Sequence, residues 1–380
     1  MKIERRRLCE DRLSRLPPNI IETILCLVPI REAARTCILS KQWMYNWTKI
    51  PKLVFDEDTF QVSIGGKNNL LLFSLIYQLL LLHQGPIVEF SLSVWTGVED
   101  TSVEVDNIIL YLSRMNTVKK LSLGYLPRIP LDVVLSFQQL TDLYLHESCC
   151  IHQQLDDDDD DDTFNSGFSS NITTLTILLV RGYMPIQNGI DNFDIIELLE
   201  YLPVIENLTI YLWHMLCTRE LPRELSTPLY HLKYMYLYDL LLGDGECFYG
   251  MPLLALLIRS SPNLEKLKLR TFRLGKPMLD TDSIEDAVVD EEADLSDYYY
   301  LFEDIEMNNN LKEMEIVDYC NMKIEMEFVK LMLVKSPVLK TLRIFLDKNV
   351  GEDEDLEILK ILLSCPRASP LVQIILHRHV

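Results

Sequence analysis

Apolar residues recur along this chain in one fixed pattern, spaced L-x-x-L-x-L, with Ile, Val, Phe or Met as substitutes for Leu. The pattern occurs ten times, and its first members lie between 22 and 47 residues apart. The ten occurrences are Ile87-Phe90-Leu92, Val118-Leu121-Leu123, Leu140-Leu143-Leu145, Ile172-Leu175-Ile177, Ile205-Leu208-Ile210, Leu232-Met235-Leu237, Leu264-Leu267-Leu269, Leu311-Met314-Ile316, Leu339-Leu342-Ile344 and Leu371-Ile374-Leu376. Such a recurrence predicts a solenoid, in which one supersecondary unit stacks on copies of itself. A solenoid offers an extended binding face rather than a catalytic pocket.

A stretch with helical spacing of apolar residues precedes the pattern in these repeats. Residues 195–199 lead into the strand-like 205–210, and residues 253–258 lead into 264–269. In both, the apolar period changes from helical to alternating across a turn that contains proline. A strand plus a helix in each unit is typical of leucine-rich repeats. We therefore expect an α/β fold with a horseshoe of about ten irregular repeats.

The residues before the array predict three short helices between Asp11 and Trp47. Pro17-Pro18 opens the first helix, where a missing N–H costs nothing. Its apolar stripe comprises Ile20, Ile21, Ile24, Leu25 and Val28. The second helix is expected over 31–39, and the third carries Trp43 and Trp47 on one side after an N-cap at Ser40. So small a unit buries little surface and normally needs a partner or a neighbouring domain.

The segment DRLSRLPPNIIETILCLVPIREAARTCILSKQWMYNW, residues 11–47, closely resembles the F-box of plant F-box proteins. The matching positions are Asp11, Arg12, Leu13, Ser14, Leu16, Pro17, Ile24, Leu25, Val28, Pro29, Ala34, Thr36, Leu39, Ser40, Lys41, Trp43 and Trp47. The resemblance implies docking onto the Skp-type adaptor of a cullin-RING ubiquitin ligase. The adaptor-binding residues that it implies are Leu16, Pro17, Ile20, Ile24, Leu25, Val28, Arg35, Lys41, Trp43 and Trp47. The alternative is a three-helix cap that only closes the end of the solenoid.

Two stretches near the end of the chain, 328–344 and 361–376, resemble the FBD region found in many such plant proteins. We interpret them as the last two repeats with a distal cap. The expected domains are thus an F-box over 8–55, a leucine-rich-repeat array over 60–310, and FBD-like repeats with a cap over 311–380.

Charge is distributed unevenly, which suggests two units with different partners. The whole chain has a net charge of −21, yet residues 1–52 carry 11 Lys or Arg against 5 Asp or Glu. The acidic body disfavours nucleic acid, and the basic head suits an acidic protein surface. The longest apolar stretch, Leu70 to Leu82, is too short to cross a membrane. Without a secretory signal, and with nine cysteines used as small core residues, we expect the nucleus and/or the cytoplasm.

Two acidic insertions interrupt the array. Residues 156–162 are seven consecutive aspartates, and residues 280–297 hold nine acidic side chains with no basic one. They are interpreted as solvated loops, with a tail for a basic partner as the alternative.

The residues between the leucines of each strand point away from the core, onto the concave face of a horseshoe. On the sixth to eighth strands, tyrosines precede a basic stripe, after which Glu313 and Glu315 follow. The target-binding candidates are Tyr211, Tyr234, Tyr236, Tyr238, Lys266, Lys268, Arg270 and Arg343. We place the centre at Tyr236, Tyr238, Lys268 and Arg270, because Tyr and Arg are enriched at interface hot spots. The alternatives are an ordinary solvated sheet face and a site for a small anionic ligand.

Catalytic and metal-binding motifs are missing from the sequence. No G-x-S-x-G, H-E-x-x-H or G-x-G-x-x-G occurs. The cysteines form no C-x-x-C pair, and no histidines lie near them at the spacing of metal ligands. We therefore expect no metal, no cofactor and no intrinsic enzyme. The predicted function is the non-catalytic substrate-recognition subunit of an SCF-type cullin-RING ubiquitin ligase, with an unknown target protein. The alternatives are a scaffold that binds a partner without its degradation, and a small-ligand co-receptor.

Overall fold

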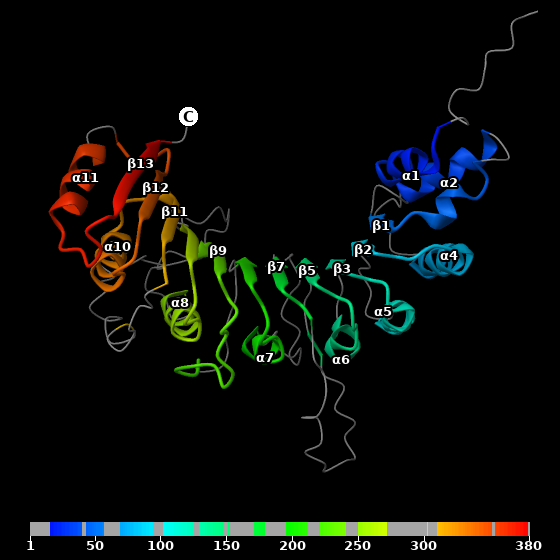
Figure 1. Ribbon diagram of the computed structural model, residues 1–380, viewed down its shortest axis with the longest axis horizontal. Helices are drawn as coiled ribbons and strands as arrows, with labels where there is room; N and C mark the ends of the chain where they lie inside the picture. The colour runs from blue at the N-terminus through cyan, green and yellow to red at the C-terminus, as the bar shows by residue number, and fades with distance from the viewer. Residues whose placement is uncertain are drawn as a thin grey trace, which may run out of the picture. The chain divides into compact units, whose positions relative to one another are not determined.

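A computed structural model describes residues 16–39, 43–56, 69–93, 102–124, 129–146, 151–152, 171–178, 195–211, 221–240, 250–271, 302, 310–351 and 354–378. These residues divide into two compact units, one up to Leu140 and one from Thr141 onward. Both units combine helices with parallel strands, so the expected α/β class is confirmed (Figure 1). Within the described residues, no helix is long and apolar enough to cross a membrane.

The first unit begins with short helices and continues into three parallel strands. Its helical elements are α1 (Pro18–Cys26), α2 (Ile30–Arg35), the 3-10 turns η1 (Thr36–Ile38) and η2 (Asn46–Lys49), α4 (Asn69–Leu82), α5 (Ser102–Met115) and α6 (Leu131–Leu135). Its strands are β1 (Lys52–Asp56), β2 (Glu89–Ser93), β3 (Lys120–Gly124) and the short β4 (Ile129–Pro130). Strand β2 pairs in parallel with β1 on one side and with β3 on the other.

The strand β1 was not predicted, because its residues were assigned to the end of the F-box. Ile50, Leu53 and Phe55 nevertheless follow the same L-x-x-L-x-L spacing as the ten repeats. All three side chains are buried, and the ring of Phe55 packs 5.6 Å from that of Phe90 on β2. The repeat pattern therefore begins inside the range 8–55 that the sequence assigned to the F-box.

The expected helices before the array differ in detail from those observed. The second expected helix, 31–39, is α-helical only to Arg35 and then tightens into the 3-10 turn η1. The third is represented among the described residues by the 3-10 turn η2, which contains Trp47, while Trp43 lies before it. Ser40, the expected N-cap, lies outside the described residues. The β-branched and aromatic residues of this stretch are weak helix formers, which favours short turns.

The second unit is a row of parallel strands with helices on one side (Figure 1). Its strands are β5 (Asp142–His146), β6 (Ile151–His152), β7 (Thr174–Leu178), β8 (Asn207–Tyr211), β9 (Tyr234–Leu240), β10 (Lys266–Thr271), β11 (Glu313–Tyr319), β12 (Thr341–Leu346) and β13 (Gln373–Arg378). Its helices are α7 (Ile195–Glu200), α8 (Gly250–Arg259), α10 (Lys323–Lys335) and α11 (Glu354–Ser364). Each strand from β5 to β13 pairs in parallel with the next, except β6.

Alternation along each strand builds the core of the second unit. Met235 and Leu237 on β9, like Leu267 and Leu269 on β10, are completely buried, and the residues between them are half-buried on the opposite face. The helices supply the other half of the core. In α8, every residue from Leu253 to Ile258 is buried. The residues between the buried ones therefore lie on the face away from the helices.

Several predicted features fall on residues that the structure does not describe. Among them are the acidic segments 156–162 and 280–297. The described cysteines Cys26, Cys37, Cys320 and Cys365 form no disulfide. The domain boundaries proposed from the sequence stay a prediction.

Candidate functional site

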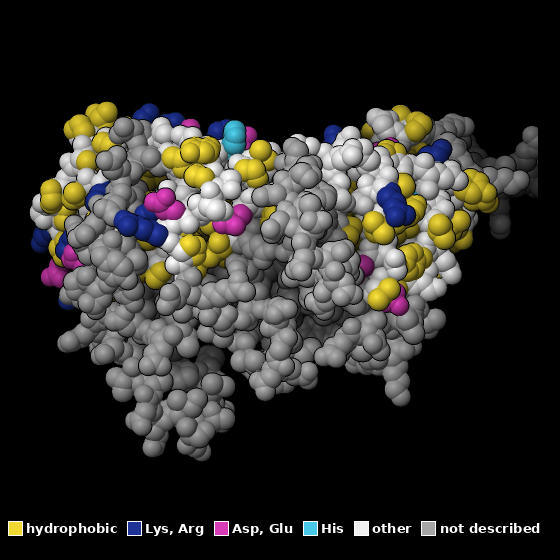
Figure 2. All heavy atoms as spheres, turned by 90° about the horizontal axis from the view of Figure 1, so that it is seen from below, with side chains coloured by type: hydrophobic (Ala, Val, Ile, Leu, Met, Phe, Trp, Pro, Cys, Tyr) yellow, Lys and Arg dark blue, Asp and Glu magenta, His cyan; other side chains and the backbone are white. Residues whose placement is uncertain are grey.

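The first helices expose a group of large apolar side chains, which we call the N-terminal apolar surface. Its members are Ile20, Ile24, Leu27, Val28, Ile38, Leu39, Met44 and Tyr45. Leu27 is 80% exposed and Ile38 is 84% exposed. Figure 2 shows hydrophobic side chains at the surface at its right-hand end, where the first unit lies. Large contiguous apolar patches on soluble proteins mark interaction sites.

The predicted apolar stripe of α1 is divided between the core and the surface. Ile21 and Leu25 are buried, whereas Ile20 and Ile24 are 41% and 37% exposed. A helix with two apolar sides can pack one side inward only, so the other side remains for a partner. The sequence alone could not distinguish the two sides, because both satisfy the same helical spacing.

The predicted adaptor-binding residues occupy three kinds of position. Ile20, Ile24, Val28, Pro17 and Arg35 are exposed, and Leu16 and Trp47 are half-buried. Leu25 and Trp43 belong to the core, so a partner would touch the surface that they support rather than these side chains. Lys41 lies outside the described residues. The guanidinium of Arg35 donates a 2.6 Å hydrogen bond to Glu32 one turn earlier. The exposed Leu27, Ile38, Leu39, Met44 and Tyr45 were not among the predicted contacts.

A closely packed junction joins these helices to the first strand–helix unit. The carbonyl oxygen of Thr48 accepts hydrogen bonds from the amides of Gln84 at 2.7 Å and Gly85 at 3.2 Å. The buried imidazole of His83 lies 2.9 Å, Nε2 to oxygen, from the carbonyl of Ile50. A Cβ at Gly85 would lie 2.7 Å from the carbonyl oxygen of Lys49 and 2.9 Å from its Cα. The two backbones approach so closely that only glycine fits at this position.

A second candidate site is the polar face of strands β8 to β12, which we call the tyrosine–ion-pair face. Parallel register places Tyr236 beside Lys268, Lys268 beside Glu315, and Glu315 beside Arg343. A neighbouring row runs from Tyr234 through Lys266 to Glu313 in the same way. The structure thus brings the eight predicted target-binding residues, Tyr211, Tyr234, Tyr236, Tyr238, Lys266, Lys268, Arg270 and Arg343, to one face of the sheet.

The tyrosines on this face form one aromatic cluster. The ring centroids of Tyr236 and Tyr238 are 3.7 Å apart, and those of Tyr211 and Tyr238 are 5.6 Å apart. The ammonium of Lys268 lies 4.9 Å from the ring centroid of Tyr236, within cation–π range. Burial and a hydrogen bond with Asp239 raise the pKa of Tyr211 to about 12. Burial, followed by a hydrogen bond with Tyr238, raises the pKa of Tyr236 as well. Both hydroxyls therefore stay protonated and able to donate.

Carboxylates on the next strand neutralise the predicted basic stripe. The ammonium of Lys268 lies 2.5 Å from Glu315, and that of Lys266 lies 3.3 Å from Glu313. Arg343 lies 3.3 Å from the same Glu313 carboxylate on its other side. Burial opposes the charged form of Glu313, but hydrogen bonds from Lys266 and Arg343 outweigh it and lower its pKa. The expectation of a free positive stripe is thus replaced by a ladder of ion pairs.

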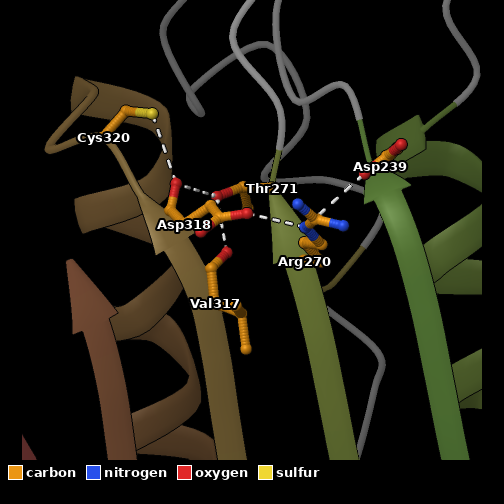
Figure 3. A network of polar contacts seen from close by, with 6 residues as sticks. All are labelled: Asp239, Arg270, Thr271, Val317, Asp318 and Cys320. Atoms are coloured by element: carbon orange, nitrogen blue, oxygen red, sulfur yellow. Dashed lines mark hydrogen bonds and ion pairs between the residues drawn. The ribbon is translucent and has the colours of Figure 1, made fainter. Parts of the chain in front are cut away.

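Arg270 is the centre of a polar network at the ends of β9, β10 and β11 (Figure 3). Its Nε donates a 2.6 Å hydrogen bond to Asp318, and it forms a longer ion pair of 3.8 Å with Asp239. The hydroxyl of Thr271 donates to the carbonyl of Asp318 at 3.1 Å, and the thiol of Cys320 lies 3.2 Å from that same oxygen. Asp239 and Asp318 both have positive φ, which Asp tolerates better than most residues. The network fixes the direction of Arg270 on the face.

A buried carboxylate supports this network from below. Glu325 is 1% exposed, and its Oε2 accepts hydrogen bonds of 3.0 Å from the amides of Cys320 and Met322. These bonds hold the turn that leads from Asp318 into α10. Burial raises the pKa of Glu325 to about 7, although the two amide hydrogen bonds oppose the shift. Glu325 was not predicted from the sequence, where it resembles any other acidic residue at a helix start.

The described part of the chain contains no group of three or more His, Cys, Asp or Glu side chains that could hold a metal ion. The two candidate sites, the N-terminal apolar surface and the tyrosine–ion-pair face, present apolar and aromatic side chains of the kind enriched at protein interfaces.

Comparison with known proteins identifies one domain family and several plant relatives. Residues 13–54 match the F-box domain family. An F-box/FBD/LRR-repeat protein of Arabidopsis thaliana is 27% identical over 433 residues, which cover 96% of this chain and 98% of that protein. A putative F-box/FBD/LRR-repeat protein of the same plant is 44% identical over 57 residues, 15% of this chain and 13% of the relative. A putative FBD-associated F-box protein is 30% identical over 114 residues, 30% of this chain and 25% of the relative. The chain thus carries an F-box domain at residues 13–54 and, along nearly its whole length, is similar to a plant F-box/FBD/leucine-rich-repeat protein.

Proposed function

We propose that this chain is the substrate-recognition subunit of an SCF-type cullin-RING ubiquitin ligase. F-box proteins generally act as substrate receptors of this kind. The N-terminal apolar surface is the observation that carries the proposal, because it leaves eight large apolar side chains of the F-box in solvent. In the proposed complex these side chains contact a Skp-type adaptor, and through it the chain joins the cullin-RING ligase.

The adaptor half of the proposal is tested by co-purification of a Skp-type adaptor with the full chain. Leu27→Asp places a charge within the apolar surface at a site that is 80% exposed, where we expect no effect on folding. Leu81→Asp is the matched control, because Leu81 is 76% exposed on α4, outside the F-box. Leu27→Asp should lose the adaptor and Leu81→Asp should retain it. Equal recovery of the adaptor by both variants would contradict the proposal.

The target half of the proposal assigns an unknown target protein to the tyrosine–ion-pair face. Its tyrosine hydroxyls are protonated and can donate hydrogen bonds. Its charged side chains form ion pairs with one another, so a partner does not need to supply opposite charges. We expect the target to bury the aromatic cluster and to bind with only weak dependence on salt. Tyr236→Ala should weaken capture of the target at least tenfold, and unchanged capture would exclude this face as the binding site.

Two alternatives predict different results. A non-degradative scaffold would hold its partner equally with and without proteasome inhibition, whereas a ligase receptor accumulates bound target when the proteasome is blocked. A small-ligand co-receptor would need free cations for an anionic ligand, but Lys266, Lys268, Arg270 and Arg343 are each ion-paired with a carboxylate. That pairing favours a protein target.

The remaining parts of the proposal follow from the same organisation. The chain performs no chemistry of its own and raises the effective concentration of the target at the remote catalytic subunit. The strands and helices after the F-box form a leucine-rich-repeat array, with the FBD-like repeats over 311–380. We propose the nucleus and/or the cytoplasm as its location, and neither nucleic acid nor membrane as a partner.

A further inference from the structure

The last strand–helix unit exposes the positions that form the core of the units before it. In the preceding repeat, Leu339, Leu342 and Ile344 are at most 1% exposed. Their equivalents in the last repeat are Leu371, which is 75% exposed, and Ile374 and Leu376, which are half-buried. A cap that covers these residues, as expected from the sequence, is not found among the described residues. Solenoids require such closure at their ends.

Strand β13 is also the last strand of its sheet among the described residues. It pairs with β12 through residues Gln373 to Arg378, and no described strand pairs with its other side. Natural edge strands are usually protected by proline, lysine or a bulge. The sequence of β13, QIILHR, has neither proline nor lysine. Its one arginine, Arg378, is held by the carboxylate of Asp355 and the carbonyl of Gly351.

The helix beside this edge adds further exposed apolar side chains. Leu356, Ile361 and Leu363 of α11 are 63%, 41% and 54% exposed. At the left of Figure 2, where the end of the second unit lies, hydrophobic side chains reach the surface. We call the edge of β13, the exposed core positions and these residues of α11 together the C-terminal end face.

The charges of this face indicate what covers it. Residues 354–378 contain three acidic side chains, Glu354, Asp355 and Glu357, and three basic ones, Lys360, Arg367 and Arg378. The whole chain has a net charge of −21, so two copies repel each other through most of their surface. The segment 354–378 carries no net charge, so it adds no repulsion between two copies. A basic partner protein would instead be attracted to the acidic body.

We propose that the C-terminal end face is the interface with a second copy of this chain. The two β13 strands pair antiparallel about a two-fold axis at Ile375, so that Ile375 lies beside Ile375 of the second copy. This register puts Ile374 of each copy opposite Leu376 of the other. These residues then lie on the face of the joined sheet that the helices cover. The exposed apolar residues of α11 then meet across the same axis. Such an interface is self-complementary and closes after two copies.

The size of the face sets the strength that we expect. Six strand residues extend ~20 Å at ~3.3 Å per residue. An edge of this length is short for a specific interface, so we expect a weak dimer that dissociates on dilution. High salt should strengthen it, because salt screens the repulsion between the acidic bodies. The dimer does not depend on the adaptor or the target.

The experiment is sedimentation velocity of the full chain over ~0.5–100 µM at 0.15 M and 0.5 M NaCl, so that a weak dimer is followed from dilute to concentrated solution. The wild type should change from a 44.3 kDa monomer to a dimer. Ile375→Lys places two like charges directly opposite each other and should raise the dissociation constant at least tenfold. Tyr230→Lys is the matched control, since Tyr230 is 58% exposed before β9, four strands away, and should leave the dimer unchanged.

A mixture of two variants tests the register itself. Ile375→Lys and Ile375→Glu should each be monomeric alone and should form a dimer when mixed, because opposite charges then face each other. A wild type that stays monomeric to 100 µM at both salt concentrations would overturn the proposal. So would a dimer that Ile375→Lys does not weaken, or a mixture that stays monomeric, since either places the contact elsewhere. If two copies associate through the exposed F-box instead, the wild type forms a dimer that Ile375→Lys does not weaken.

Discussion

The junction between the F-box and the array permits a sharp prediction at Gly85. In Gly85→Ala, the new Cβ would lie 2.7, 2.9 and 3.1 Å from the carbonyl oxygen, Cα and carbonyl carbon of Lys49. These are backbone atoms, so they cannot rotate away, and the two segments must separate. The separation weakens the two hydrogen bonds from the amides of Gln84 and Gly85 to Thr48.

The expected cost follows from those contacts. Two backbone hydrogen bonds at ~1 kcal/mol each, plus ~1 kcal/mol for repacking of the buried contact, give a loss of about 3 kcal/mol. With an m value of ~3 kcal/mol/M, the urea midpoint of the first unit should fall by about 1 M. The assay is urea unfolding followed by tryptophan fluorescence, since Trp43 and Trp47 report on the F-box.

Gly351→Ala is the matched control. A Cβ there would meet only the side-chain oxygen of Glu354, at 3.3 Å, and that side chain can move. The control should therefore lie within ~0.5 kcal/mol of the wild type. If Gly85→Ala is as stable as Gly351→Ala, the F-box is not held to the array by this junction.

Three further predictions concern the tyrosine–ion-pair face and its support. The pKa of Glu325 is raised from its ordinary value near 4.5 to about 7. Between these two pH values the folded state binds more protons than the unfolded state, so the stability of the wild type falls as the pH rises. Glu325→Gln should therefore gain stability relative to the wild type, by up to ~2–3 kcal/mol between pH 5 and 8 in urea unfolding, and a constant difference would contradict the assignment. Asp318→Ala should cost about 1 kcal/mol more than Asp318→Asn in thermal unfolding, because Asn tolerates the positive φ of 57° and Ala does not; equal losses would refute the backbone argument. A double-mutant cycle on Lys268 and Glu315 should give a coupling of ~0.5–1 kcal/mol that decreases in 0.5 M NaCl, and a coupling of zero would show that the pair is only incidental.

Apolar spacing alone predicted much of the fold. The last two members of all ten patterns lie on observed strands, because alternation leaves a parallel strand one way to bury its apolar side against a helix. The same spacing at Ile50, Leu53 and Phe55 was readable, but the resemblance to the F-box assigned those residues elsewhere. The repeat pattern was therefore present at these residues, but it was interpreted as part of the F-box.

The site was harder to predict, because it depends on which strands lie side by side. Lys268 and Glu315 are 47 residues apart, and only the register of β10 and β11 brings them together. Sequence therefore identified the tyrosines and the basic residues but not their neutralisation. Exposure of Leu27 and Leu371 depends equally on what a neighbouring element leaves uncovered, which local spacing does not encode.

The central claim is that the N-terminal apolar surface docks onto a Skp-type adaptor, and calorimetric titration tests it most directly. Adaptor titrated into the full chain at several temperatures should bind one to one with a clearly negative heat-capacity change, because apolar surface leaves water. Leu27→Asp should weaken the affinity at least tenfold and make the heat-capacity change smaller, while Leu81→Asp should match the wild type. Absence of binding by the wild type, or identical binding by Leu27→Asp, would contradict the account.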